Sequence, residues 1–183
     1  MMKEWVPIPG TNKDRLITVA LEEFSKKGYK GVNITELAER ANMTTGAVYH
    51  HFGSKAKLYE VIRTEIEQRI LDRMEGAASL FDKRSEALKA AMITGMDFVA
   101  NNDLSHLISE PSPFNKNDKI EGFLSDLNTF NDLPIEFVLM ASWRSIIKGI
   151  ANEQLTIKQG KDLINWLFQR DWDISWKKLL NHE

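Results

Sequence analysis

Residues 33–55 limit the fold of this chain more than any other segment. They predict two short helices joined by a tight turn and followed directly by the start of a longer helix. Asn33 can cap the first short helix, and Glu36 stands three residues later, as in a capping box. Asn42 falls where the chain must turn sharply, and asparagine tolerates a left-handed backbone. The segment therefore predicts a helix-turn-helix unit.

The second short helix divides into an inner and an outer face. Thr44 can cap it, and Val48 and Phe52, four residues apart, face back toward the preceding helix. The outer face then holds Thr45, Gly46, Tyr49 and His50. Small, aromatic and hydrogen-bonding side chains on an exposed helix are what a protein needs to read a DNA groove.

This segment resembles the DNA-binding domain of the TetR (tetracycline repressor) family of bacterial transcription regulators. The resemblance rests on the order of helix, turn and short helix, then Tyr-x-His-Phe at 49–52 and Ser-Lys-x-x-Leu at 54–58. It covers about the first third of the chain and includes Ala20, Leu21, Phe24, Gly28 and Tyr29 upstream. Asn42 replaces the usual turn glycine, a change that the turn should tolerate.

The resemblance implies an all-α fold in two parts. An N-terminal three-helix DNA-binding domain would occupy residues 1–56 and continue into a linking helix at 54–76. A helical effector-binding and dimerisation domain would occupy residues 57–183. The implied function is a ligand-responsive repressor that binds a palindromic operator as a homodimer, with double-stranded DNA, a second copy of the chain and a mostly apolar small molecule as partners.

The periodicity of apolar residues predicts helix almost everywhere else. The first helix should span residues 12–27, where Gly28 stops it. Later helices are expected at 85–100, 119–128, 133–152 and 157–180, with Thr156 capping the last. The prolines and polar residues of 101–118 predict a loop or short helical turns.

Charge and composition agree with a DNA-binding N-terminal head joined to a body that does not bind DNA. Residues 1–63 hold ten Lys or Arg and seven Asp or Glu, a net +3, whereas residues 64–183 carry −5. The absence of cysteine excludes disulfides and thiol catalysis. No apolar run is long enough to span a bilayer and no signal peptide is evident, so we expect no membrane association and a cytoplasmic protein.

The candidate DNA contacts each have a simpler structural interpretation. Tyr49 could be a packed aromatic residue, and Lys55 an ordinary solvated lysine, but Lys55 occupies the first turn of a helix, where a phosphate is attracted. His50 and His51 are adjacent and cannot chelate one metal ion well, so we expect polar contacts with DNA and no metal site. The full predicted set is Thr35, Thr44, Thr45, Gly46, Tyr49, His50, His51 and Lys55.

The body holds side chains that could line a ligand cavity or merely fill a core. Methionine and aromatic residues together are typical of an adaptable apolar pocket. The candidates are Met92, Met96, Phe98, His106, Leu107, Phe114, Phe123, Trp143 and Arg144.

The last two predicted helices carry the candidate dimer surface. Small residues three or four apart allow two helices to approach closely, although packing within one chain would explain them equally. The predicted interface residues are Ala141, Ser145, Gly149, Trp166 and Trp172.

Two other functional classes explain less of the sequence. An all-helical protein-interaction or scaffold protein could carry a helix-turn-helix that is structural only. An enzyme is disfavoured, because the sequence has no Gly-rich phosphate loop, no metal-ligand spacing and no nucleophile–base pair. No cofactor is predicted.

Overall fold

The computed structural model describes residues 10–114, 118–128 and 134–169, and all regular structure in these ranges is helical. This confirms the predicted all-α fold. The helices are α1 (Asn12–Gly31), α2 (Ile34–Arg40), α3 (Thr45–Phe52), α4 (Lys55–Ala78), α5 (Arg84–Asn101), α6 (Ser105–Ile108), α7 (Lys119–Asp126), α8 (Ile135–Ala151) and α9 (Ile157–Leu167). Among the described residues, no helix is long and apolar enough to cross a membrane.

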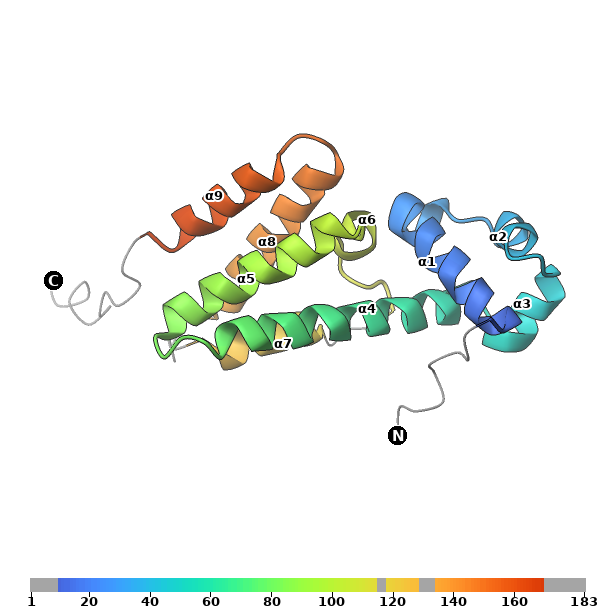
Figure 1. The fold of residues 1–183 in the computed structure, drawn as a ribbon, viewed down its shortest axis with the longest axis horizontal. Coiled ribbons are helices and arrows are strands. Elements are labelled where there is room, and N and C mark those ends of the chain that lie inside the picture. The colour runs from blue at the N-terminus through green and yellow to red at the C-terminus, as the bar shows by residue number, and fades with distance from the viewer. Residues whose placement is uncertain (1–9, 115–117, 129–133, 170–183) are drawn as a thin grey trace, which may run out of the picture.

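The molecule is elongated, with a small three-helix head at one end and a larger helical body at the other (Figure 1). Helices α1, α2 and α3 form the head. Helix α4 starts beside α3 and runs along the body, where it packs against α5 and α7. Helix α6 lies at the head end of α5 and packs against α1. The long α4 and the short α6 therefore both connect the two parts.

Helix α1 is interrupted where the sequence predicted that it would stop. Gly28 has φ 64° and ψ −179°, a backbone conformation that only glycine adopts readily, and a short helical stretch then continues to Gly31. The kink turns Tyr29 toward α4, where its ring packs edge to face against Tyr59 at 5.1 Å. The break at Gly28 thus places Tyr29 in the contact between head and body.

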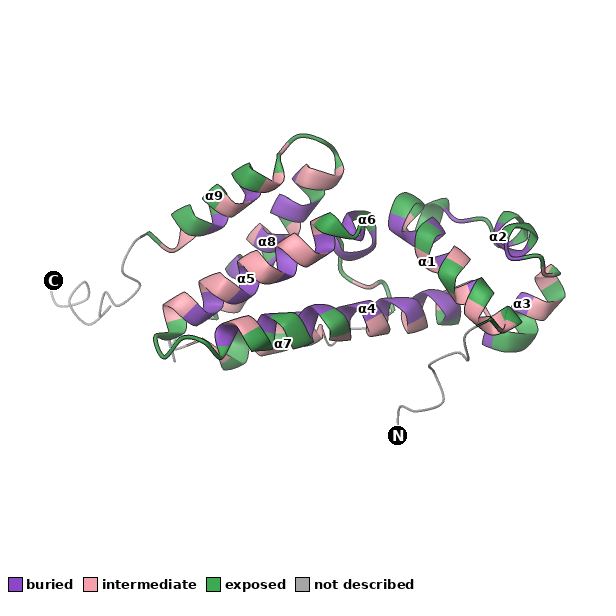
Figure 2. Cartoon of the chain, in the orientation of Figure 1, coloured by how far each residue is buried: buried purple, intermediate pink, exposed green. Residues whose placement is uncertain are grey.

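The body core is built around a buried tryptophan. Trp143 of α8 is fully buried, and its indole N–H donates to the backbone carbonyl of Met92 on α5 at 2.9 Å. Gly95 of α5 allows this close packing, because a Cβ there would lie 2.9 Å from the sulfur of Met74 and 3.2 Å from the Trp143 ring. Burial alternates with exposure along each helix (Figure 2).

Several predicted boundaries change by a few residues. The 101–118 segment contains α6, a single helical turn, which is one of the two predicted outcomes for this segment. Helix α9 begins with the predicted Thr156 cap as a full capping box with Gln159, but it ends at Leu167. The predicted continuation of that helix over 170–180 lies outside the described residues.

A buried carboxylate ties α1 to α2. Glu23 is 5% exposed, and its oxygens pair with Lys27, at 2.7 Å, and with Arg40. The Lys27 hydrogen bond and the two nearby positive charges hold the pKa of the Glu23 carboxyl below its usual value, although burial opposes the shift. The carboxylate therefore stabilises the folded head in its ionised form.

We expect the stability of the head to fall in acid through this residue. A carboxyl whose pKa is lower in the folded than in the unfolded chain stabilises the fold at neutral pH, and this contribution is lost as pH drops below about 4. Glu23→Gln should lower the free energy of unfolding at pH 7 by about 1–3 kcal/mol. It should also flatten the acid limb of stability measured by urea denaturation. The exposed Glu39→Gln is the control, and an equal effect of both changes would contradict this role.

Candidate nucleic-acid interface

The turn between α2 and α3 has the geometry that the sequence predicted. Asn42 adopts φ 53°, and the Met43 amide donates to the Ala38 carbonyl at 2.9 Å to close the turn. Asn33 Oδ1 accepts from the Thr35 amide at 2.8 Å and so caps α2. Glu36 does not pair with this cap in the described contacts, and its carboxylate lies 3.7 Å from Lys27.

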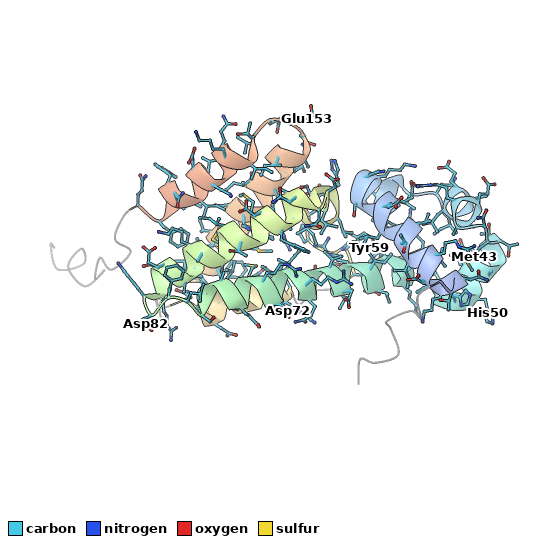
Figure 3. The ribbon with its side chains drawn as sticks, in the orientation of Figure 1. Met43, His50, Tyr59, Asp72, Asp82 and Glu153 are labelled. Atoms are coloured by element: carbon cyan, nitrogen blue, oxygen red, sulfur yellow. The ribbon has the colours of Figure 1, made fainter. Side chains whose placement is uncertain are left out.

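Helix α3 presents one face to the head and one face to solvent. Val48 and Phe52 are buried, as predicted, and the Thr44 hydroxyl caps the helix by accepting from the Ala47 amide at 3.2 Å. Tyr49 is 46% exposed, which disposes of the alternative that it is a packed core aromatic. His50 is exposed at the outer end of the head (Figure 3).

The remaining predicted contact residues lie around this outer face. Thr35, Thr44, Gly46 and His51 are exposed, whereas Thr45 and Lys55 are half-buried. The rings of His50 and His51 lie 5.7 Å apart, edge to face. The eight predicted residues thus come from α2, from α3 with its N-cap, and from the start of α4, which the fold places at one end of the molecule (Figure 1).

Lys55 has a partner that the sequence analysis missed. Its ammonium lies 4.7 Å from the centre of the Tyr29 ring, in a cation–π contact. Burial lowers the pKa of this ammonium group. Ser54 caps α4 beside it by accepting from the Lys57 amide at 3.1 Å. Tyr29 therefore holds a positive charge at the first turn of α4, and a helix start that carries such a charge can bind a DNA phosphate.

Positive charge gathers further around α3. The Lys13 ammonium of α1 lies 5.9 Å from the centre of the Phe52 ring, and Lys57 lies beside Gly53 at the end of α3. Neither lysine was singled out from the sequence. Their positions could be found only once α1 and α4 were packed on either side of α3.

The candidate ligand residues do not form one group. Met92, Met96, Leu107 and Trp143 are buried in the body core. Phe98 lies under the Arg73 guanidinium at 4.0 Å, and Phe114 packs on Tyr29 at the head–body junction, at 4.9 Å. His106 is exposed, Phe123 is half-buried, and Arg144 is ion-paired with Asp118. Four of the nine thus fill the core, and a ligand site among them stays a prediction.

The candidate dimer residues include exposed residues and a buried one. Ala141 and Ser145 are exposed on α8, and Trp166 is exposed on α9. Gly149 is buried in its own chain, because a Cβ there would lie 2.7 Å from Leu155 Cδ1, so this glycine closes the α8–α9 turn and offers no surface to a partner. Trp172 lies outside the described residues.

Residues 16–62, which include the turn, the outer face of α3 and Lys55, match the family described as bacterial regulatory proteins, tetR family. These residues therefore form a DNA-binding head of the TetR type. The match spans α2 and α3 with parts of α1 and α4, so it covers the head and its junction with the body.

The chain is similar to curated operon repressors. It is 26% identical over 134 residues to the probable acrEF/envCD operon repressor of Escherichia coli K12, a match that covers 70% of this chain. The chain spans 61% of the length of that relative.

Solved structures show the same fold over nearly the whole chain. A TetR-like transcriptional regulator from a Rhodococcus species matches with a TM-score of 0.69, covering 96% of this chain and 100% of its own at 17% identity. The regulator FadR from Bacillus subtilis, solved in complex with stearoyl-CoA, matches with a TM-score of 0.63 over 85% of this chain and 97% of its own, at 13% identity.

Proposed function

We propose that the chain is a cytoplasmic, ligand-responsive transcriptional repressor that binds a palindromic operator as a homodimer. The observation that carries this proposal is the outer face of α3, where Tyr49 and His50 are exposed, followed by the Lys55 charge at the start of α4. A groove-reading helix next to a phosphate-binding helix start is a DNA-binding arrangement. The acrEF/envCD operon repressor supports the sign of regulation.

A purely structural helix-turn-helix is not favoured. Such a unit would place the α3 face against protein, whereas Tyr49, His50 and His51 are exposed in the folded chain. The acidic residues Glu22 and Glu23 are paired with two cations of the head, Arg40 and Lys27, so they do not cancel the positive charge around α3. The residue types and the charge both suit nucleic acid better than a protein partner.

Dimerisation through α8 and α9 has support from exposed apolar side chains. Phe137 and Val138 at the start of α8 are 61% and 59% exposed, and Ala141 follows on the same face. Leu163 and Trp166 are exposed on α9, which packs against α8. Exposed large apolar side chains are typical of an interface. Members of the TetR family bind operators as dimers.

We propose a mostly apolar effector that binds within residues 85–170. The core beside α4 is rich in methionine, and Met74 and Met96 have their sulfur atoms next to Gly95 and Gly160. Flexible methionine side chains can move to admit an apolar molecule at low cost. The stearoyl-CoA complex of FadR makes acyl chains the first class to test.

Two substitutions should separate phosphate contact from base reading. Lys55→Ala should weaken binding to every duplex and reduce the slope of log affinity against log salt by about one, because one phosphate contact is lost. Thr45→Val should instead change the preference among sites. Binding is measured by fluorescence anisotropy on a site enriched from random duplexes. Lys89→Ala, on α5, is the control, and a Lys55→Ala salt slope equal to that of wild type would contradict the phosphate role.

The effector should bind DNA-free protein more tightly than operator-bound protein. A thermal-shift screen of fatty acids, acyl-CoAs and aromatic compounds would find ligands, and calorimetry with and without operator would measure the coupling. We expect about a 5–150-fold difference in affinity, and the same factor in the reverse experiment. A ligand that binds equally well in both cases would rule out the regulatory interpretation for that site.

A further inference from the structure

A buried arginine on α4 caps the end of α6. The Arg63 side chain is 3% exposed and makes four hydrogen bonds. Its guanidinium donates to Glu67 Oε1 at 2.7 Å, the Tyr59 hydroxyl at 3.0 Å, the Leu107 carbonyl at 2.6 Å and the Glu110 carbonyl at 2.7 Å. The last carbonyls of a helix have no partner within that helix, and a cation satisfies them well. Arg63 thus fastens α6 to α4.

The position of α6 gives this attachment a consequence for the head. Helix α6 packs against α1, the first helix of the head, and against α8 of the body. It stands at the junction of the two parts, close to the labelled Tyr59 (Figure 3). An element that touches the head and is fastened to α4 restrains how the head can tilt on the body.

The restraint extends to the proposed DNA surface. The Tyr59 ring packs edge to face on Phe24 and on Tyr29 of α1, in both cases at 5.1 Å. Tyr29 in turn carries the Lys55 ammonium. Lys55, Tyr59 and Arg63 are four residues apart and therefore lie on one face of α4. This face runs from the start of α4 at the DNA end to the interior of the body.

The face of α4 that carries Lys55, Tyr59 and Arg63 ends in the body at a second buried charged residue. Glu67, four residues after Arg63, is 4% exposed. Burial raises the pKa of its carboxyl, and the Arg63 charge opposes that rise. Asp118, which caps α7, and Arg144 of α8, its ion-pair partner, also act on Glu67 electrostatically. The Arg63–Glu67 pair thus lies where α4, α7 and α8 come together.

We propose that Arg63 is a positioning residue that fixes the orientation of the DNA-binding head on the body. This rests on the proposed function, because orientation is read out as the separation of two heads in a dimer. With Arg63 in place, α6 and α4 hold α1 between them and the dimer accepts one spacing between half-sites. Without it, α6 is released from α4, the heads tilt more freely, and the choice of spacing relaxes.

The first test measures tolerance of half-site spacing. The double variant Arg63→Met/Glu67→Met removes both charges, so that neither is left buried and unpaired. Arg63→Lys keeps the positive charge, but an ammonium cannot reproduce the forked arrangement of N–H donors of the guanidinium. The control is Arg69→Met, because Arg69 lies on the same helix with an exposed side chain. Affinity is measured for the enriched site and for the same site with one or two base pairs inserted at its centre.

The proposal predicts a loss of discrimination with an intact fold. Wild type and Arg69→Met should lose about 5–150-fold in affinity on insertion, the range of a typical coupling energy. The double variant should lose less than about threefold in affinity on the same insertion. Arg63→Lys should lose a factor between that of the double variant and that of wild type. Circular dichroism and melting show which variants fold. Wild-type discrimination in either folded variant would overturn the proposal.

A second measurement needs no DNA. Amide hydrogen exchange across residues 104–112 should be faster in the Arg63 variants than in wild type, because the α6 turn loses its cap, and unchanged in Arg69→Met. If exchange is unchanged in a folded Arg63 variant, the positioning role fails. If wild type selects no DNA site, the proposed function fails instead, and the exchange result still decides whether Arg63 holds α6.

Discussion

Val138→Asp is expected to split the homodimer and to lower affinity for a two-half-site duplex by about 10²–10⁴-fold, the advantage that a linked second binding module provides. Val138 is 59% exposed in the single chain, so the carboxylate should leave the fold intact. In a dimer this carboxylate would be buried without a partner. The resulting loss of free energy would exceed what the contacts of an interface of ordinary size provide.

Light scattering and binding to single and double half-sites check this result. The variant should be monomeric at micromolar concentration and should bind a single half-site as wild type does. Glu75→Lys, an exposed change on α4, is the control. A Val138→Asp protein that remains dimeric would place the interface elsewhere on the molecule.

Trp143→Ala is expected to lower the free energy of unfolding by about 3–5 kcal/mol, the usual cost of truncating a buried tryptophan. The side chain is fully buried, lies against Gly95 and donates to the Met92 carbonyl. Its loss leaves a cavity and breaks the connection between α5 and α8. Urea denaturation measures the effect.

Two further variants divide this loss into its parts. Trp143→Phe keeps most of the ring volume and loses the hydrogen bond, so it should cost about 1–2 kcal/mol. Phe81→Ala, at the exposed turn after α4, should have little effect. If Trp143→Ala is no worse than Phe81→Ala, the body core has been assigned wrongly. Partial restoration of Trp143→Ala by an apolar compound would identify a ligand for the methionine-rich region.

Local sequence signals predicted several helix caps and the turn of the head well. The caps at Asn33, Thr44 and Thr156 and the left-handed turn at Asn42 depend on residues close in sequence, and all four are present. The inner face of α3 could also be predicted from spacing alone, because Val48 and Phe52 are four residues apart.

Contacts between distant segments could not be predicted in the same way. Gly149 was assigned to a dimer surface from the spacing of small residues, but the turn after α8 brings Leu155 over it. Met92 and Trp143 are as suited to a core as to a pocket, and only their packing shows that the core uses them. Arg63 was overlooked because its acceptors, the Leu107 and Glu110 carbonyls, are more than forty positions away.

One signal for the junction was nevertheless present in the sequence. Lys55, Tyr59, Arg63 and Glu67 recur every fourth residue along α4, a spacing that predicts a polar row on one face of a helix. A charged pair four residues apart is usually solvated, which hides its importance. Here α6 and α7 cover that face and bury the pair.

Selection of bound sequences from random duplexes by the wild-type protein tests the central claim most directly. We predict enrichment of one motif with two inverted half-sites whose centres lie about 34–36 Å apart, the distance between successive major grooves on one side of the duplex. The enriched duplex should be bound by one dimer, and Thr45→Val should select a different motif. Recovery of no motif, or of a single half-site without its inverted copy, would contradict the claim that this chain reads a palindromic operator as a homodimer.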